Sequence, residues 1–241
     1  MRLSVIIPAY NEEKRISNTL REIDKYLRQQ PYEYEILVVN DGSKDATAQT
    51  VRTMEPEIKG LRLIDNEVNK GKGGVVRQGL LAAKGEARLF MDADNSTSVD
   101  QVEKMWPEFE KGFDVVIGSR DIKGAVLDPP QPWKRIILGD IFNLVVQIIL
   151  GLWGIKDTQC GFKALSAKAV NRIMPQCKID RWAFDPEILI LARGMGFKIK
   201  QIPVHWINDP DSKVKLKGAI RMLREVAEIR WNLIAKKYSF K

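Results

Sequence analysis

Two carboxylates, Asp92 and Asp94, follow an apolar segment at residues 89–91 and are separated by a single residue. Carboxylates at this spacing, at the end of a buried strand, suit a hard divalent cation of the kind that proteins use to hold a diphosphate. Ligands of open α/β sheets bind at the carboxyl ends of strands, which is where this pair is expected to lie. The same residues also suit an Asx turn that ends a strand. Other loops of the sequence are therefore needed to distinguish a metal site from a simple turn.

The first half of the chain alternates between apolar segments typical of strands and amphipathic segments typical of helices. We predict strands at residues 3–8, 35–40, 61–65, 88–91 and 114–118, helices at residues 12–29 and 99–109, and two helices that end near Met54 and Ala83. Strands that alternate with helices imply a parallel sheet with right-handed crossovers. The predicted fold class is therefore α/β, with a mostly parallel sheet and helices on both faces.

Four loops follow the first four predicted strands, at residues 8–12, 40–43, 69–74 and 92–94. In a parallel sheet these loops lie at the same edge, so they can converge on one ligand. Carboxylates in the loops can accept hydrogen bonds from a ribose or a base, glycines let backbone N–H groups approach phosphates, and lysines add positive charge. The glycine-rich signatures of dinucleotide-binding enzymes and of P-loop NTPases are absent, which argues against both classes.

Composition narrows the classes further. The 241 residues are enough for one large domain or two small ones. Cys160, Cys177 and the single histidine, His205, argue against a zinc site, a disulfide framework and a histidine-rich metal site, and they fit a reducing compartment. No nucleophile elbow accompanies the histidine. Because the first predicted strand begins at residue 3, we expect no signal peptide.

The positive charge is concentrated near the C-terminus. Residues 213–241 hold nine Lys or Arg and two Asp or Glu, which accounts for most of the formal net charge of +8. Such a segment attracts anionic membranes and nucleic acids. Aromatic RNA-binding motifs are absent, so we expect no nucleic-acid partner.

Two segments suggest contact with a membrane surface. Residues 136–155 are long enough to span a bilayer, but Asp140, Asn143 and Gln147 share one helix face, and an Asp at mid-membrane costs roughly 2.5–3.5 kcal/mol. The stripe fits a helix that lies at an interface with its apolar side down, or a core helix with one wet face. A second amphipathic helix is predicted at residues 217–237. It can lie on an anionic membrane or pack on its own domain.

The motifs SVIIPAYNEE, VVNDGSKD, NKGKGG and MDADNS, in this order, resemble those of the inverting GT-A glycosyltransferases of family 2. The later segments 116–120, 157–163 and 181–185 resemble the polyprenyl-phosphate (dolichyl-phosphate) hexosyltransferases, particularly the glucosyltransferase branch. The resemblance covers roughly residues 1–210. It implies a GT-A (Rossmann-like) catalytic domain over residues 1–210, which includes the amphipathic segment 136–155, and a basic amphipathic helix at residues 211–241.

The resemblance also implies roles for individual residues. Asp92 and Asp94 are expected to hold Mg²⁺ or Mn²⁺ on the diphosphate, and Arg120 and Arg135 to hold the acceptor phosphate. The nucleotide is expected to lie against Pro8, Tyr10, Glu12, Asp41, Lys70, Gly71, Lys72 and Asp92. The mannosyl relatives have Ser where this chain has Gly139, which leaves Lys134 as a substitute, and they have Gln where it has Ser96, which leaves the third metal ligand open.

The implied reaction is metal-dependent, inverting transfer of a hexose from a nucleotide sugar to a polyprenyl or dolichyl phosphate. UDP-glucose is the favoured donor and GDP-mannose stays open. Asp94 is the first catalytic candidate. Asp185 or Asp157 is expected to orient the acceptor, or to act as a base if the acceptor is a hydroxyl. For Asp185 the alternative is a helix N-cap before Pro186, and for Arg120 it is a surface ion pair.

A lipid acceptor would explain both amphipathic segments. The acceptor phosphate lies at the membrane surface, so the enzyme must lie there too. We expect a peripheral enzyme on the cytoplasmic face of a membrane, held by residues 136–155 and 213–241. Two other hypotheses remain. One is a family 2 enzyme that adds a sugar to a glycan hydroxyl, and the other is a non-catalytic basic module that binds a membrane surface or nucleic acid.

Overall fold

The computed structural model of the chain describes residues 1–130, 133–207 and 216–240. For residues 133–135, 137, 216 and 217 it describes the backbone but not the side chains. Its strands are β1 (Leu3–Ala9), β2 (Tyr34–Asp41), β3 (Leu61–Asn66), β4 (Ala87–Met91), β5 (Val115–Ser119), β6 (Val126–Asp128), β7 (Phe162–Ser166), β8 (Ile199–Pro203) and β9 (His205–Ile207).

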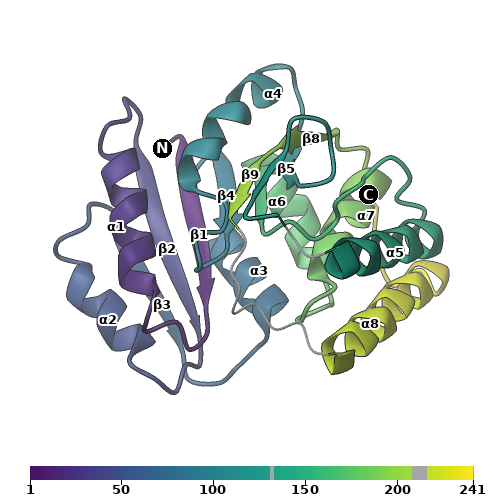
Figure 1. Ribbon diagram of the computed structural model, residues 1–241, viewed down its shortest axis with the longest axis horizontal. Helices are drawn as coiled ribbons and strands as arrows, with labels where there is room; N and C mark the ends of the chain where they lie inside the picture. Colours follow the sequence, from purple (N-terminus) through teal and green to yellow (C-terminus); the bar gives the residue numbers. More distant parts are fainter. Residues whose placement is uncertain (131–132, 208–215, 241) are drawn as a thin grey trace.

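The helices connect these strands and cover the sheet (Figure 1). They are α1 (Ile16–Leu27), α2 (Thr47–Met54), α3 (Lys72–Ala82), α4 (Trp106–Glu110), α5 (Trp133–Leu150), α6 (Ala167–Ile173), α7 (Phe184–Gly194) and α8 (Leu216–Ile234), with 3₁₀ turns η1 (Val99–Lys104) and η2 (Met174–Gln176). The predicted helix at 99–109 is divided between η1 and α4. Pro107 stands at the start of α4, where a missing backbone N–H costs no helical hydrogen bond.

A seven-stranded sheet runs through the molecule in the order β3-β2-β1-β4-β7-β5-β8, and β6 pairs with β9 in a separate sheet. Neighbouring strands of the large sheet are parallel, except that β7 runs antiparallel to both β4 and β5. The predicted α/β class with a mostly parallel sheet is therefore confirmed. Because β1, β2, β3 and β4 are mutually parallel, the loops that follow them lie at one edge of the sheet.

The sheet has an apolar cluster on each face, because successive side chains of a strand point to opposite sides. Ile6 and Leu37 lie in the cluster that also holds buried residues of α3, α6, α7 and α8. Val5 and Val38 lie in the cluster that α1, α2 and α4 complete. Both faces of the central strands are therefore covered, which explains why those strands are apolar along their whole length.

The polarity of α5 differs from the prediction. Asn143 was expected on a wet face, but it is only 9% exposed, and its side-chain oxygen accepts a hydrogen bond from the Thr158 hydroxyl at 3.0 Å. Helix α5 exposes the apolar residues Leu138, Ile141, Leu144 and Ile148, and Asp140 is exposed as well. The expectation for Asn143 was wrong because a buried asparagine that finds a partner is as acceptable as a solvated one. Among the helices that the structure describes, none combines the length and the hydrophobicity that a membrane span requires.

Helix α8 packs against α5 and α7, and α5 and α8 lie side by side at one end of the molecule (Figure 1). Met222, Val226 and Ile229 face inward and belong to the same apolar cluster as α7. The helix therefore packs on its own protein, which is one of the two predicted arrangements. Its outward side exposes another apolar group, which consists of Ile220, Leu223, Trp231 and Ile234.

Candidate active site

A cavity of about 550 Å³ lies at the carboxyl edge of the sheet, beside the ends of β1, β2 and β4. The four loops that were expected to converge all contribute to its wall. The predicted residues that line it are Pro8, Tyr10, Glu12, Asp41, Gly71, Lys72, Asp92 and Asp94. A hollow of about 760 Å³ at the opposite edge is lined by Arg2, Trp106 and Asp114 among others, and the carboxylate pair does not reach it.

Asp92 is paired with the first residue of α3. The Lys72 ammonium lies 2.5 Å from Asp92 Oδ1. Although burial disfavours the charged ammonium, the negative charges of Asp92, Asp185 and Asp94 raise the pKa of Lys72 above its usual value. A lysine that stays charged at this position can neutralise phosphate oxygens that enter the cavity.

Asp94 adopts the turn that the sequence offered as an alternative to a metal site. Its Oδ1 accepts a hydrogen bond from the Ser96 backbone N–H at 2.9 Å, and Asn95 between them has a positive φ of 54°. This Asx turn points the carboxylate of Asp94 into the cavity beside Asp92. The turn and the site are therefore compatible, because the turn uses one of the two carboxylate oxygens.

The cavity concentrates negative charge. Burial raises the pKa of Glu12, and the nearby charges of Asp94 and Asp92 raise it further, against the opposing effect of Arg15. In the part of the chain that the structure describes, no three Asp, Glu, Cys or His side chains form a group that could hold a metal ion. Two carboxylates nevertheless fit Mg²⁺, which usually takes one or two carboxylates together with water and substrate phosphates. The Lys72 ammonium against Asp92 shows that this carboxylate already holds a positive charge.

Asp41 organises the glycine loop. Its carboxylate accepts hydrogen bonds from the backbone N–H groups of Lys70 and Gly71, at 2.5 and 3.2 Å, and from the Asn69 amide at 2.8 Å. Burial raises the pKa of Asp41, while these backbone N–H groups oppose the rise. Gly71 has a φ of 85°, and a Cβ there would overlap the Asp180 carbonyl oxygen, so only glycine fits.

Lys70 was expected beside the nucleotide, and it departs from that place. The Lys70 side chain reaches the Gln78 side chain at 3.4 Å and does not line the cavity. Trp182 does line it, with 48% of its surface exposed, and its ring lies 5.9 Å from the Lys72 ammonium. Phe184, its neighbour in the motif, is buried in the core. The exposed indole therefore offers an apolar wall beside the Lys72 ammonium.

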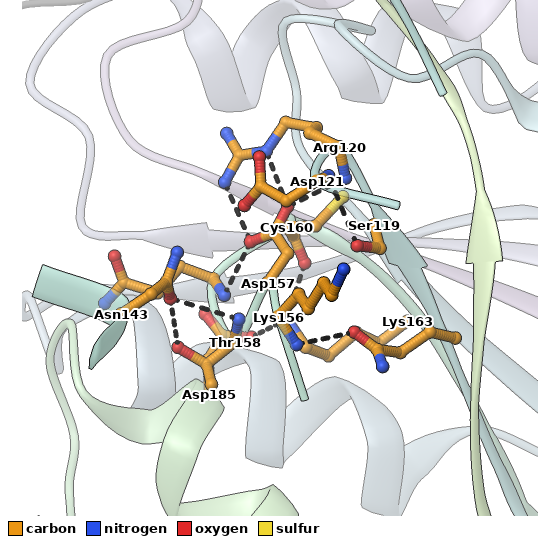
Figure 2. Close-up of polar contacts among 12 residues, drawn as sticks. Ser119, Arg120, Asp121, Asn143, Lys156, Asp157, Thr158, Cys160, Lys163 and Asp185 are labelled. Carbon is orange, nitrogen blue, oxygen red and sulfur yellow. Dashed lines mark hydrogen bonds and ion pairs between the residues drawn. The ribbon is translucent and has the colours of Figure 1, made fainter. Parts of the chain in front are cut away.

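Arg120 and Asp157 form a two-pronged ion pair, drawn in Figure 2. Arg120 Nε and Nη2 donate to the two carboxylate oxygens at 2.7 and 3.0 Å, and its backbone N–H donates at 3.1 Å. Asp157 is fully buried. Burial by itself would raise the pKa of Asp157. The charge and hydrogen bonds of Arg120 outweigh this effect and hold the pKa of Asp157 below its usual value. Asp157 therefore fixes the guanidinium while part of the Arg120 side chain stays exposed.

Asp121, beside this pair, is predicted to make stability depend on pH. Partial burial and the charges of Asp157 and Asp140 raise its pKa to about 6, above the ordinary aspartate value of about 3.9. A raised folded-state pKa gives stability that is fully present below about pH 4 and is lost as the pH rises through about 6. We expect Asp121→Asn to flatten this part of the curve, measured as urea midpoints from pH 4 to 7. Parallel curves for the two proteins would contradict the assignment.

A second buried pair joins Lys163 of β7 to Asp185 in the first turn of α7 (Figure 2). The Lys163 ammonium lies 2.6 Å from Asp185 Oδ1 and donates to the Cys160 carbonyl at 2.5 Å. Both residues are almost completely buried. Burial raises the pKa of Asp185, against the lowering effect of Lys163 and Lys72. Asp185 was predicted as catalytic, and the structure places it against a lysine and outside the cavity lining.

The remaining acceptor candidates, Lys134 and Arg135, lie in the first turn of α5. Their side chains are outside the described part of the structure. Gly139 lies one turn later, and a Cβ there would meet no atom within 4 Å. A serine would therefore fit at this position, so close packing does not explain the glycine.

Sequence reasoning gave no role to Lys163, Asn69 or Arg181. A lysine inside the apolar strand Phe162–Ser166 was a usable signal, because a buried lysine requires a partner. Asn69 and Arg181 carry no comparable signal. Each lines the cavity through contacts with residues distant in sequence, such as the Asn69 amide on Asp41.

Comparisons with known proteins show which proteins the chain is similar to. The sequence profile of the family described as "Glycosyl transferase family 2" matches residues 4–174. A dolichyl-phosphate beta-glucosyltransferase of Trichomonas vaginalis is 37% identical over 235 residues, which cover 93% of this chain and 69% of the relative. The human dolichyl-phosphate beta-glucosyltransferase is 34% identical over 230 residues, with 88% and 69% covered.

Solved structures share the fold at low identity. Glucosyl-3-phosphoglycerate synthase of Mycobacterium tuberculosis, in complex with UDP, has a TM-score of 0.68 at 16% identity and covers 95% of this chain and 80% of that one. The same enzyme with Mn²⁺, UDP and phosphoglyceric acid has a TM-score of 0.67 at 18% identity, with 98% and 78% covered. At these identities the similarities show that the fold is shared.

Proposed function

The chain belongs to glycosyl transferase family 2, and from this premise we propose that it transfers a hexose from a nucleotide sugar to a polyprenyl or dolichyl phosphate. The observation that carries the proposal is the cavity where Asp92, Asp94 and Lys72 meet the Asp41-bound glycine loop. The names of the most similar relatives support glucose and dolichyl phosphate. UDP-glucose is therefore the favoured donor, and GDP-mannose is the alternative.

The nucleotide is proposed to bind along the first three loops. Pro8, Tyr10 and Glu12 form one wall, and Asp41 with Gly71 forms another. Lys72 lies close enough to Asp92 to share the diphosphate with it. Trp182 gives a flat apolar surface beside Lys72, which suits one face of a hexose ring.

Asp92 and Asp94 are proposed to hold Mg²⁺ or Mn²⁺. When bound, such a cation stabilises the negative charge that develops on the diphosphate leaving group. The neighbouring Lys72 ammonium adds positive charge to the same oxygens. Solved relatives in complex with UDP and either Mn²⁺ or Mg²⁺ support this choice of ions.

The acceptor phosphate is proposed to bind at Arg120, with Lys134 and Arg135 as further candidates. A phosphate monoester has a second pKa near 6, so it is mostly dianionic at pH 7 and needs no strong base to attack. It does need positive charge that brings two anions together, and Arg120 supplies this in an orientation fixed by Asp157. In-line attack inverts the anomeric carbon.

Asp185 and Asp157 are proposed to act by holding basic side chains in place. Each is paired with a buried or half-buried basic side chain, Lys163 or Arg120 respectively. A sugar hydroxyl needs a general base within reach of its proton. Carboxylates that are already committed to ion pairs suit that task poorly, so this pairing favours a phosphate acceptor over the glycan hydroxyl alternative.

The exposed apolar residues of α5 and α8 are proposed as a membrane-docking face. It consists of Leu138, Ile141, Leu144 and Ile148 of α5 and Ile220, Leu223, Trp231 and Ile234 of α8. Arg221, Arg224 and Arg230 are exposed on the same helix α8. Apolar burial combined with attraction to anionic lipids is the usual basis of interfacial binding. We propose that residues 1–210 carry the chemistry and that residues 211–241 help to hold them on the cytoplasmic face of a membrane.

A negative charge on this face is expected to weaken docking. In Leu144→Glu and Trp231→Glu, an apolar side chain that is 50% or 61% exposed becomes an anion. Burial of such a side chain is worth about 1.5–3 kcal/mol, so we expect binding to phosphatidylserine vesicles to fall by roughly tenfold or more. Vesicle co-sedimentation measures this. Leu81→Glu on α3 is the matched control, and an equal loss in all three variants would count against the face.

The proposed reaction is tested with purified protein, a short polyprenyl phosphate and a panel of UDP- and GDP-sugars in Mg²⁺ or Mn²⁺. Mass spectrometry should detect a hexosyl lipid phosphate, most strongly with UDP-glucose. A glycan acceptor that outcompetes the lipid phosphate would favour the hydroxyl alternative. Failure of every donor with both metals would refute the proposed reaction.

A further inference from the structure

Gly161 lies directly against the carboxylate of Asp92. A Cβ added at Gly161 would lie 2.5 Å from Asp92 Cγ and 2.8 Å from Oδ1, and it would overlap Oδ2. Real Cβ atoms essentially never approach other heavy atoms so closely. The backbone of Gly161 has no positive φ, so its conformation does not require glycine. Glycine at this position therefore leaves room for the Asp92 carboxylate, which a larger residue would displace.

The peptide that carries this contact is held from behind by Lys163. The Lys163 ammonium donates to the carbonyl of Cys160, at 2.5 Å, and that carbonyl belongs to the peptide bond between Cys160 and Gly161. Asp185 keeps the ammonium in place at 2.6 Å. Burial of an ion pair is a poor way to stabilise a fold, because desolvation offsets most of the attraction. A positioning role accounts for the pair better than stability does.

The other side of the same segment is anchored as well. Two residues before Cys160, Thr158 donates its hydroxyl to Asn143 of α5 at 3.0 Å, and Asp157 holds Arg120 (Figure 2). The peptide at Gly161 is therefore fixed between two sets of buried contacts. A rigid peptide is what a carboxylate needs if its oxygens are to stay in one orientation.

We propose that Gly161 leaves the space in which the Asp92 carboxylate lies. We also propose that Lys163, held by Asp185, keeps the peptide between Cys160 and Gly161 in place. Both are positioning residues, since neither lines the cavity. The inference rests on the proposed function in one respect, namely that Asp92 binds the cation on a nucleoside diphosphate. Loss of groups that orient a metal ligand typically weakens metal affinity by about 10–100-fold.

The test is calorimetry of UDP binding with and without Mg²⁺. In Gly161→Ala the added methyl group pushes the Asp92 carboxylate from its place, so we expect UDP affinity in Mg²⁺ to fall by roughly 10–100-fold. Affinity without metal should change little, which also reports that the loops are folded. Gly218→Ala is the matched control, because a Cβ there meets no atom within 4 Å. It should bind UDP as the wild type does.

A second variant keeps the test decisive if Gly161→Ala does not fold. Lys163→Met combined with Asp185→Leu replaces the ion pair by apolar residues of similar size, which buried pairs often tolerate. It leaves the Cys160 carbonyl without its donor, so the same loss of metal-assisted affinity is expected. If either folded variant binds UDP in Mg²⁺ with wild-type affinity, the positioning role of Gly161 and Lys163 is refuted. If the wild-type protein itself shows no metal-assisted UDP binding, it is the proposed function that fails.

Discussion

Replacement of Asp94 by alanine is expected to reduce hexose transfer by roughly 10³-fold, the equivalent of about 4 kcal/mol in the activation barrier. Asp94 is the carboxylate that the turn at Ser96 directs into the cavity beside Asp92. Without it, one of the two proposed protein ligands of the cation is lost, and the leaving diphosphate loses stabilisation. The measurement is the initial rate of transfer at saturating Mg²⁺, together with circular dichroism to establish that the variant is folded.

Asp100→Ala is the matched control for this variant. Asp100 is an exposed acid six residues further along the chain that bonds Gln101 and does not line the cavity. The same change in net charge at Asp100 should leave the rate within about twofold of wild type. Equal rates for Asp94→Ala and wild type would exclude Asp94 from the reaction.

Replacement of Asp157 by asparagine is expected to reduce the free energy of unfolding by about 3–5 kcal/mol, because it leaves the Arg120 guanidinium without its buried counter-charge. The urea midpoint at pH 7 measures the loss. The folded-state pKa of Asp157 is lowered, so its contribution is present above about pH 4 and is lost as the pH falls below that value. The difference between variant and wild type should therefore be constant near neutral pH and shrink in acid.

Asp180→Asn is the control for this stability effect. Asp180 pairs with Arg77 at 2.6 Å, but its side chain is 50% exposed, and exposed pairs contribute only about 0–1 kcal/mol. A loss for Asp157→Asn as small as that for Asp180→Asn would mean that the Arg120–Asp157 pair does not support the fold.

The sequence predicted those parts of the fold that depend on local pattern. The strands at residues 3–8 and 35–40 were recognised because they are continuous apolar runs, and the structure extends each by only one or two residues. The loops after them could be placed at one edge because parallel strands end on the same side. The direction of β7 could not be predicted, since a buried strand looks the same in sequence whether it runs parallel or antiparallel.

Contacts between distant residues set the limit of sequence reasoning at the site. The inward turn of Asn143 depends on Thr158, and the burial of Lys163 depends on Asp185, which stands on a different element. Neither partner can be chosen from the local pattern alone. Conversely, the Asp92 and Asp94 pair could be recognised from sequence because its spacing and its place after a strand are local features.

The most direct test of the account compares two acceptors that differ only in their phosphate. Purified protein with UDP-glucose and Mg²⁺ is given either a short polyprenyl phosphate or the matching polyprenol, and labelled lipid product is counted. We predict glucosylated lipid phosphate from the first and no product from the second, because Arg120 attracts an anionic nucleophile and the two candidate bases, Asp157 and Asp185, are committed to ion pairs. Transfer to the alcohol, or transfer to neither lipid, would contradict the account.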